Sequence, residues 1–349
     1  MGEVSAQSSE SPEFLRISLA AAMTLGMKTG SFYRNARLEC INLLMTYGEG
    51  CAANCAYCGL QRARQGTYDK KSFIRVDWPV VSLEEIISRS KTNPQVKRIC
   101  LSMITNGKAV KDSEIILQRL HQELPGIPLS LLCTPTLLRR EHLERYRAIP
   151  VDRLGIAVDG ATPEIFDKFR GKGVRGPHRW EKYWELFQEA LEIFGQDHVG
   201  IHLIVGLGET EEQMIRLMDR IRKQGGSTHL FSFFPEPGSQ LKEHPQPPAG
   251  QYRRCQLARY LIDQDLAEAR DFSFNEKGQI VSFGLSPVEL ERVIASGLPF
   301  MTSGCPGPDG KAVCTRPYGD CAPGEDIRSF PFQPEPEDLA LIRRQLWQY

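Results

Sequence analysis

Short apolar runs alternate with helix-forming segments along most of the chain. Turn residues flank each run, and helix-start signals such as Ser82-Leu-Glu-Glu85 and Thr162-Pro163-Glu164 precede several of the intervening segments. Buried strands that alternate with helices predict an α/β protein with a parallel sheet and right-handed crossovers. Six such units predict an open, partial (β/α)6 barrel of the TIM type, with its chemistry on the loops after the strands. The six runs occupy residues 40–45, 98–103, 128–133, 154–158, 199–205 and 229–234.

Regions of different composition flank the predicted barrel. Ser11-Pro12-Glu13 has the pattern of a helix start, and the apolar stretch from Phe14 to Met27 predicts a helix. Proline and glycine become frequent after Pro237-Gly238, which is typical of a linker. The expected organisation is an N-terminal helical extension, the barrel, and a C-terminal region with further helices and a cysteine-bearing coil. Their predicted bounds are residues 1–38, 39–240 and 241–349.

Composition and charge narrow the function. The 349 residues are 41% hydrophobic and 25% charged, which is ordinary for a folded globular protein. Lys plus Arg and Asp plus Glu both number 43, so the net charge is zero and electrostatic capture of nucleic acid or anionic membrane is not expected. No apolar run approaches the roughly 18 residues of a membrane helix. We see no signal-peptide pattern at the N-terminus and expect a cytoplasmic protein.

Ten cysteines carry the candidate chemistry. In a reducing compartment, clustered cysteines indicate metal ligands or catalytic groups rather than disulfides. The first cysteine group, Cys51, Cys55 and Cys58, has the spacing C-x3-C-x2-C directly after the first strand. Three thiolates on one loop can bind three corners of a [4Fe–4S] cube and leave the fourth iron open for a small molecule. Zinc is the competing interpretation, but a structural zinc site needs four ligands.

This motif, at the start of a strand–helix series, resembles the radical S-adenosylmethionine (SAM) superfamily over about residues 40–240. The resemblance implies that Cys51, Cys55 and Cys58 hold a [4Fe–4S] cluster. SAM would bind the fourth iron through its amino and carboxylate groups. An electron from the cluster would then cleave SAM to methionine and a 5′-deoxyadenosyl radical, which removes hydrogen from an unactivated carbon. A ferredoxin or flavodoxin is the expected electron donor.

The same resemblance implies positions that contact SAM. Three of these positions also have an ordinary structural explanation: packing for Tyr57, a helix start for Asp159 and a solvated basic loop for Arg175. The family often places Gly-Gly-Glu at the end of the second strand to grip the amino group, and this chain has the small polar residues from Ser102 to Asn106 there. The implied contacts are adenine for Tyr57, ribose for Asp159, the SAM amino group for Ser102, the SAM carboxylate for Arg175, and adenine for the segment with Val205, Gly206 and Glu209.

A second cysteine group, Cys305, Cys314 and Cys321, lies in a coil rich in glycine and proline. Three cysteines in a segment with few apolar residues suggest a metal-stapled coil, and an auxiliary [4Fe–4S] cluster is favoured over zinc or free thiols. The overall plan resembles the sulfur-inserting radical SAM enzymes and is similar to the split, two-protein lipoyl synthases.

That resemblance implies that the auxiliary cluster donates sulfur to an octanoyl chain on a lipoyl carrier domain. It also implies a second radical SAM protein as partner. A carbon radical needs sulfur within about 3.5 Å to be trapped, so the C-terminal segment is expected to fold over the barrel mouth.

Other interpretations remain open. Biotin synthase binds a [2Fe–2S] cluster with cysteines on strands two and three, where this chain has Cys100 and Cys133, but its third position is occupied here by about Gly200. Packing is the favoured role for Cys100 and Cys133 and for Cys40 and Cys255. A hydrogenase maturase or a methylornithine-forming mutase would share the barrel without inserting sulfur. An iron–sulfur electron carrier and a zinc hydrolase are weaker alternatives, since the histidines are scattered.

Overall fold

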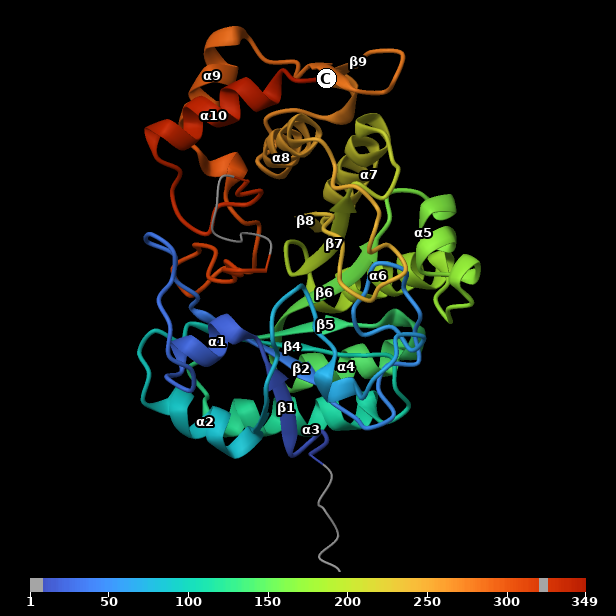
Figure 1. Cartoon of the computed structure of the whole chain (residues 1–349), viewed down its shortest axis with the longest axis vertical. Coiled ribbons are helices and arrows are strands. Elements are labelled where there is room, and N and C mark those ends of the chain that lie inside the picture. The colour runs from blue at the N-terminus through green and yellow to red at the C-terminus, as the bar shows by residue number, and fades with distance from the viewer. Residues whose placement is uncertain (1–8, 320–325) are drawn as a thin grey trace, which may run out of the picture.

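The computed structural model describes residues 9–319 and 326–349, and its centre is a mainly parallel sheet (Figure 1). The sheet has eight strands in the order β3-β1-β2-β4-β5-β6-β7-β8. From β2 to β8 every neighbouring pair is parallel, so the six predicted apolar runs form six parallel strands in sequence order. These are β2 (Cys40–Met45), β4 (Arg98–Ser102), β5 (Leu129–Cys133), β6 (Val151–Asp159), β7 (Val199–Val205) and β8 (Ser227–Ser232).

Two antiparallel strands extend the sheet beyond β2, which the sequence did not predict. β1 (Phe14–Ile17) pairs with β2 on one side and with β3 (Val80–Ser82) on the other. The predicted helix from Phe14 to Met27 is therefore wrong: its first part is β1, and a helix, α1 (Leu19–Thr24), begins only after Ser18. β1 lies between two strands, so pairing across the sheet overrides the local helix-start pattern.

Helices follow most of the parallel strands, as the alternating pattern predicted. Side-chain caps begin several of them where expected: Ser82 accepts a hydrogen bond from the backbone N–H of Glu85, and Thr210 accepts one from Gln213. The helix after β5 was not predicted. The barrel helices are α2 (Leu83–Lys91), α3 (Ala109–Glu123), α4 (Arg140–Ala148), α5 (Pro163–Phe169), α6 (Trp180–Phe194) and α7 (Glu211–Lys223).

The C-terminal region packs against the last units of the barrel (Figure 1). α8 contacts α7 and β8, and a buried ion pair between Arg254 and Glu211, with atoms 2.6 Å apart, joins the two helices. The division of the chain at residues 38 and 240 stays a prediction. The C-terminal elements are α8 (Ala249–Asp263), β9 (Ser273–Phe274), β10 (Ile280–Ser282), α9 (Pro287–Ala295) and α10 (Pro336–Leu346).

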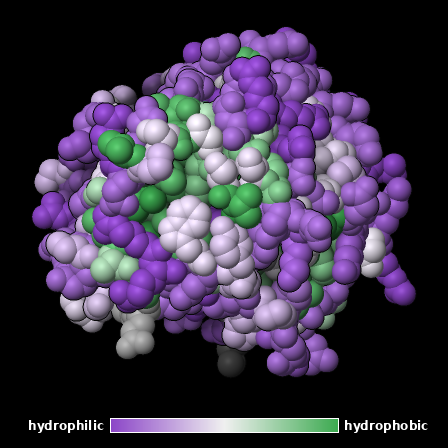
Figure 2. Space-filling view, turned by 90° about the horizontal axis from the view of Figure 1, so that it is seen from above, coloured by the Kyte–Doolittle hydropathy of each residue, from purple (hydrophilic) through white to green (hydrophobic). Residues whose placement is uncertain are grey.

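The end of the molecule that carries α9 and α10 exposes apolar side chains. Figure 2, which views this end, shows them gathered inside a polar rim. The large apolar residues exposed on or next to these elements are Val288 of α9, Leu298 shortly after α9, and Trp347 and Tyr349 after α10. Among the described residues, no helix has the length and apolarity needed to cross a membrane.

Strand alternation determines which side chains face the interior of the curved sheet. Asn42 of β2, Cys100 of β4 and His202 of β7 point into an interior cavity, and the residues two positions further along each strand do so too. The residues between them, such as Leu43 and Leu101, are fully buried in the layer between the sheet and its helices. The interior of the sheet is therefore the only side on which polar and cysteine side chains of these three strands meet.

Candidate active site

A cavity of about 310 Å³ lies inside the curved sheet and reaches the carboxyl ends of its strands. All three residues of the first cysteine group line it, together with Ser102 and Asp159 at the ends of β4 and β6. Chemistry in folds of this type is placed at the carboxyl ends of the strands. The structure thus brings together the loop and strand ends that the sequence analysis selected.

The loop that carries the first cysteine group is fixed by its neighbours. The backbone N–H of Ala52 donates to the carbonyl of Thr105 after β4, and that of Ala56 donates to the carbonyl of Phe169 at the end of α5, both at 2.7 Å. The side-chain amide of Asn54 donates to the carbonyl of Val174 at 2.8 Å. These bonds use the polar groups of the loop on the protein side, so the thiols are left to face the cavity.

The three thiols fit an iron–sulfur cube better than a single ion. Burial, with a smaller contribution from the nearby Cys51, raises the pKa of Cys55 to about 11 although the charge of Arg170 opposes this shift. Across residues 9–319 and 326–349, no three Cys, His, Asp or Glu side chains converge closely enough to hold one metal ion. A cube binds each thiolate on a different iron and therefore tolerates wider spacing than zinc does. The backbone N–H of Leu60 also donates to the sulfur of Cys58 at 3.4 Å, the kind of bond that stabilises a cluster thiolate.

A buried polar network joins the cysteine loop to β6. The hydroxyl of Tyr57 donates to a carboxylate oxygen of Asp159 at 2.5 Å, and the guanidinium of Arg170 contacts both groups. Arg170 also donates to the hydroxyl of Tyr183 at 3.1 Å, which in turn lies 2.9 Å from Nδ1 of His178. Burial and the charge of Arg170 lower the pKa of His178 to about 2, so this imidazole is neutral. Tyr57 and Asp159 were predicted from the sequence, whereas Arg170, which holds them together, was not.

The remaining predicted SAM contacts are placed differently. Ser102 lines the cavity, whereas Arg175 is exposed and its side chain lies outside the cavity lining. Val205, Gly206 and Glu209 also lie outside the lining, and the Glu209 carboxylate accepts the backbone N–H groups of Gly206 and Leu207 at 2.6 and 3.0 Å. This carboxylate therefore stabilises the turn after β7. The SAM contacts assigned to these residues stay predictions.

Other cavity residues could have been found from the strand pattern. Ile204 of β7 and Phe231 of β8 line the cavity, as do Asn42 and His202. Each lies at an inward position of an alternating strand, and an alternation count gives their direction. The coil residue Arg316 also lines the cavity, with its guanidinium over the ring of Phe231 at 4.1 Å, and no local signal indicated it.

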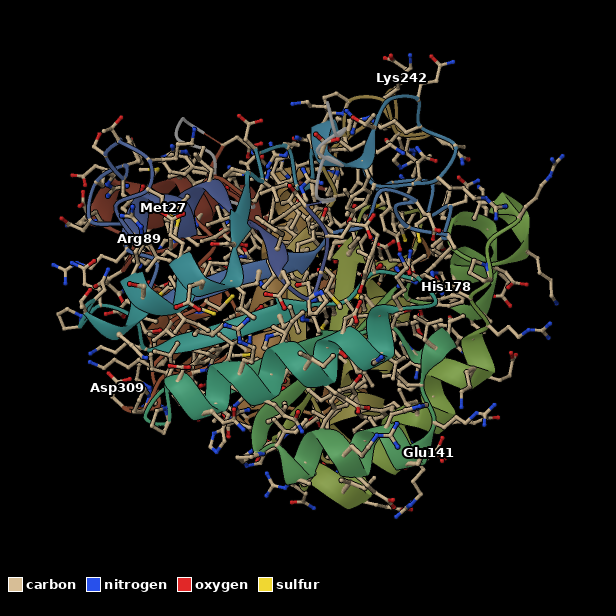
Figure 3. The ribbon with its side chains drawn as sticks, turned by 90° about the horizontal axis from the view of Figure 1, so that it is seen from below. Met27, Arg89, Glu141, His178, Lys242 and Asp309 are labelled. Atoms are coloured by element: carbon tan, nitrogen blue, oxygen red, sulfur yellow. The ribbon has the colours of Figure 1, made fainter. Side chains whose placement is uncertain are left out.

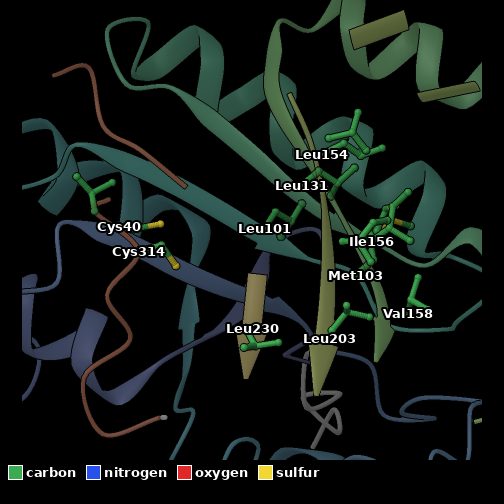
Figure 4. Packing of buried hydrophobic residues seen from close by; sticks show 14 of the residues in the cluster. Cys40, Leu101, Met103, Leu131, Leu154, Ile156, Val158, Leu203, Leu230 and Cys314 are labelled. Carbon is green, nitrogen blue, oxygen red and sulfur yellow. The ribbon is translucent and has the colours of Figure 1, made fainter. Parts of the chain in front are cut away.

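Cys305 and Cys314 of the second cysteine group are not at the barrel mouth. A turn with a bridge between Pro306 and Ala312 brings Cys305 and Cys314 together, and the backbone N–H of Val313 donates to the carbonyl of Cys305 at 3.1 Å. The Cys314 sulfur lies beside Cys40, the first residue of β2 (Figure 4). The expectation that this segment folds over the mouth is therefore wrong for Cys305 and Cys314.

These two cysteines lie at the amino ends of the strands because Arg98, the first residue of β4, donates to the carbonyl of Pro306 at 2.7 Å. Figure 3 shows Asp309, in the same turn, on the opposite side of the molecule from His178 of the polar network. After this turn, Arg316, Pro317 and Gly319 line the cavity, whereas Tyr318 does not. Cys321 lies outside the described residues.

Comparison with known proteins agrees with this geometry. The sequence model of the radical SAM superfamily matches residues 45–221, which is half of the chain. A GTP 3′,8-cyclase from Picosynechococcus sp. is 30% identical over 134 residues, covering 38% of this chain and 40% of the cyclase. A biotin synthase from Acetivibrio thermocellus is 23% identical over 197 residues, covering 54% of this chain and 55% of the synthase. The chain thus matches about half or less of the length of these curated relatives.

Solved structures show the same fold. The FeFe-hydrogenase maturase HydG from Carboxydothermus hydrogenoformans is 18% identical with a TM-score of 0.52, covering 84% of this chain and 77% of the maturase. Methylornithine synthase is 13% identical with a TM-score of 0.50, covering 70% of this chain and 66% of the synthase. At these identities the similarity supports the fold and does not identify a substrate.

Proposed function

This chain belongs to the radical SAM superfamily, and on that premise we propose that it is a SAM-cleaving enzyme that inserts sulfur into an unactivated C–H bond. A [4Fe–4S] cluster on Cys51, Cys55 and Cys58 would supply the electron that generates a 5′-deoxyadenosyl radical from SAM. The most specific form of the proposal is a lipoyl synthase component that acts on an octanoyl chain carried by a lipoyl carrier domain. A second cluster on the cysteines of the C-terminal coil would be the sulfur source.

One observation carries the proposal: the first cysteine group and one described member of the second group, Cys314, reach the same cavity. Cys51, Cys55 and Cys58 line it from the carboxyl end of β2, and Cys314 lines it from the C-terminal coil. Sulfur insertion requires a radical source and a sulfur source on either side of one substrate carbon, since a carbon radical must be trapped before it reacts elsewhere.

The lining of the cavity suits an aliphatic substrate. Leu44, Ile204 and Phe231 present apolar surface to the cavity that the cysteines also line. Such a lining would position an alkyl chain and keep water away from a reactive carbon. Tyr57, Asp159 and Arg170 lie nearer the first cysteine group and offer hydroxyl, carboxylate and guanidinium groups to the polar parts of SAM.

A second candidate function is sulfur insertion into a free small molecule, as the name of the biotin synthase relative suggests. The observation that favours it is that Cys100 and Cys133, which lie on β4 and β5, also line the cavity. The two candidates share a mechanism and differ in whether the substrate is carried by a protein. A maturase or mutase without sulfur insertion, or an electron carrier, would differ from both in its products.

The deciding experiment is anaerobic incubation with SAM, dithionite and an octanoylated carrier peptide, with products measured by mass spectrometry. The proposal predicts 5′-deoxyadenosine together with a peptide that has gained sulfur. 5′-Deoxyadenosine without added sulfur, also when the second radical SAM protein is supplied, would reject the octanoyl substrate. Absence of 5′-deoxyadenosine from a fully reconstituted protein would reject the SAM-cleaving activity and favour an electron carrier. The variant Cys55→Ala is the control, since it is expected to form neither product.

A further inference from the structure

Four cysteines from three separate parts of the chain meet at the amino ends of the first two parallel strands. They are Cys40 of β2, Cys100 of β4, and Cys305 and Cys314 of the C-terminal coil. The Cys40 thiol contacts that of Cys314, and both Cys100 and Cys305 are close enough to act on it electrostatically. Figure 4 shows the sulfurs of Cys40 and Cys314 side by side. Packing was the role predicted for Cys40 and Cys100, so their contact with the coil cysteines was not expected from the sequence.

The sheet register explains two of the four positions. β2 and β4 are parallel, with Cys40 opposite Arg98 and Asn42 opposite Cys100. Cys40 and Cys100 therefore lie on the same inward face of neighbouring strands, one alternation apart. Such a placement is fixed by the backbone of the barrel and leaves little freedom to either thiol.

The coil is anchored so that its two cysteines face these strands. The buried guanidinium of Arg98 donates to the carbonyl of Pro306 at 2.7 Å, and the backbone N–H of Leu230 in β8 donates to the hydroxyl of Ser303 at 2.9 Å. These bonds lie on both sides of Cys305. A coil with few apolar residues of its own is thus tied to two different strands of the barrel, with Cys305 between the two ties.

The polar groups around the four thiols suit a thiolate-bound anion. The side-chain amide of Asn42 donates to the sulfur of Cys314 at 3.4 Å and contacts that of Cys40 at 3.7 Å. Two cations lie near these thiols: Arg98 is two positions before Cys100 on β4, and Arg316 lines the same cavity as Cys100 and Cys314. Amide donors and cations beside cysteine sulfurs are the features that tune and stabilise protein-bound iron–sulfur clusters.

We propose that Cys40, Cys100, Cys305 and Cys314 together hold an iron–sulfur cluster, so that the auxiliary site is shared between the barrel and the C-terminal coil. This assignment supplies four protein ligands without Cys321. A cluster fits better than zinc because no three of the metal-binding side chains in the described part of the chain converge on a single point, as tetrahedral zinc would require. Cys100 and Cys314 also line the cavity, so the cluster would face the substrate.

The inference deepens the proposed function, because it names the ligands of the sulfur source, but its test measures bound metal and does not depend on any product. In the full chain, Cys51→Ala, Cys55→Ala and Cys58→Ala are combined to remove the first site. This background is reconstituted anaerobically with iron and sulfide and analysed for iron, sulfide and zinc. We expect iron and sulfide in similar amounts and a brown protein with visible absorbance.

Two further changes, Cys40→Ser and Cys100→Ser, are then added to the background. We expect bound iron to fall at least fivefold, whereas Cys255→Ser, at a buried cysteine of α8, should leave it unchanged. Cys305→Ser is tested separately and is also expected to lower the bound iron. Because Cys305 lies on the coil and not on a strand, this loss would not come from a change within the barrel strands. Circular dichroism verifies that each variant is folded.

Several results would overturn the inference. They are full iron content in the folded Cys40→Ser, Cys100→Ser variant, zinc in place of iron and sulfide, or no metal in the background variant. Failure of this inference is distinguished from failure of the proposed function by a second measurement. SAM cleavage is assayed in a protein that carries only Cys40→Ser and Cys100→Ser. If that protein cleaves SAM, the radical chemistry stands whatever the second site binds.

Discussion

The hydroxyl of Tyr57 lies 2.5 Å from a carboxylate oxygen of Asp159, and Arg170 contacts both. Tyr57 is the residue before Cys58 in the cysteine loop, and Asp159 is the last residue of β6. The pair therefore ties the cluster loop to the middle of the sheet, 102 positions further along the chain. Burial raises the pKa of Tyr57 well above its usual value, so the tyrosine is the proton donor in this bond.

Replacing Arg170 tests how much this network contributes to stability. Arg170→Met leaves the buried Asp159 carboxylate without its cation, and removal of one partner from a buried pair costs about 3 kcal/mol. We expect that loss in the free energy of unfolding, measured by denaturant titration under anaerobic conditions. Arg175→Met, at an exposed position on the same loop, should change the free energy of unfolding by less than about 0.5 kcal/mol. Equal losses in the two variants would contradict the network's role.

Cys305→Ala separates radical formation from sulfur transfer. Cys305 lies away from the first cysteine group, so the variant should form 5′-deoxyadenosine at close to the wild-type rate. It should form less than about a tenth of the sulfur-containing product, since the sulfur source would lose a ligand. Cys255→Ala, at a buried cysteine of α8 that does not line the cavity, is the control for general damage. Equal sulfur insertion by Cys305→Ala and wild type would exclude sulfur donation from this site.

Local patterns were sufficient for the barrel and for the first cysteine group. Each parallel strand was an apolar run bounded by turn residues, and caps such as Ser82 began helices where they were expected. The spacing of Cys51, Cys55 and Cys58 is a property of one short loop, so the sequence alone contains it. Tyr57 and Asp159 were found for a similar reason, because each lies beside a recognisable motif.

Contacts between distant segments could not be predicted in the same way. Arg170 meets Tyr57 only because α5 and the cysteine loop are adjacent in space, with 113 positions between them. Cys314 meets Asn42 across 272 positions, through a coil whose own composition indicates no direction. The strand at Phe14–Ile17 was missed because its partners, β2 and β3, are what make it a strand.

Acid should destabilise the protein through His178. Burial and the charge of Arg170 lower the pKa of this imidazole from an ordinary value near 6.5 to about 2 in the folded state. The unfolded chain therefore binds a proton below pH 6.5 that the folded chain does not bind, and stability falls as the pH falls through that range. At about 1.36 kcal/mol for each unit of pH, His178 contributes a loss of about 2 kcal/mol between pH 7.5 and pH 5.

The contribution of His178 is measured by difference. The free energy of unfolding of wild type and of His178→Asn is determined from pH 7.5 to pH 5. The asparagine variant is expected to be less stable at pH 7.5, because His178 bonds to Thr136 and Tyr183, but to lose about 2 kcal/mol less than wild type on acidification. If the free energy of unfolding fell by the same amount with pH in both proteins, His178 would not be the group whose protonation destabilises the fold.

Two glycines in the turn after β7 allow backbone strain and steric clash to be separated. Gly206 and Gly208 both have a φ of +108°, a conformation in which a side chain costs of order 1–3 kcal/mol. A Cβ at Gly206 would lie 2.7 Å from the ring of Pro247, whereas at Gly208 it would meet nothing within 4 Å. Gly208→Ala should therefore show the strain alone, and Gly206→Ala should lose at least a further 1 kcal/mol from displaced packing. Both are read as free energies of unfolding from denaturant titration. Equal stability of Gly206→Ala and Gly208→Ala would contradict this prediction. It would show that close packing of Pro247 is not the reason for glycine at position 206.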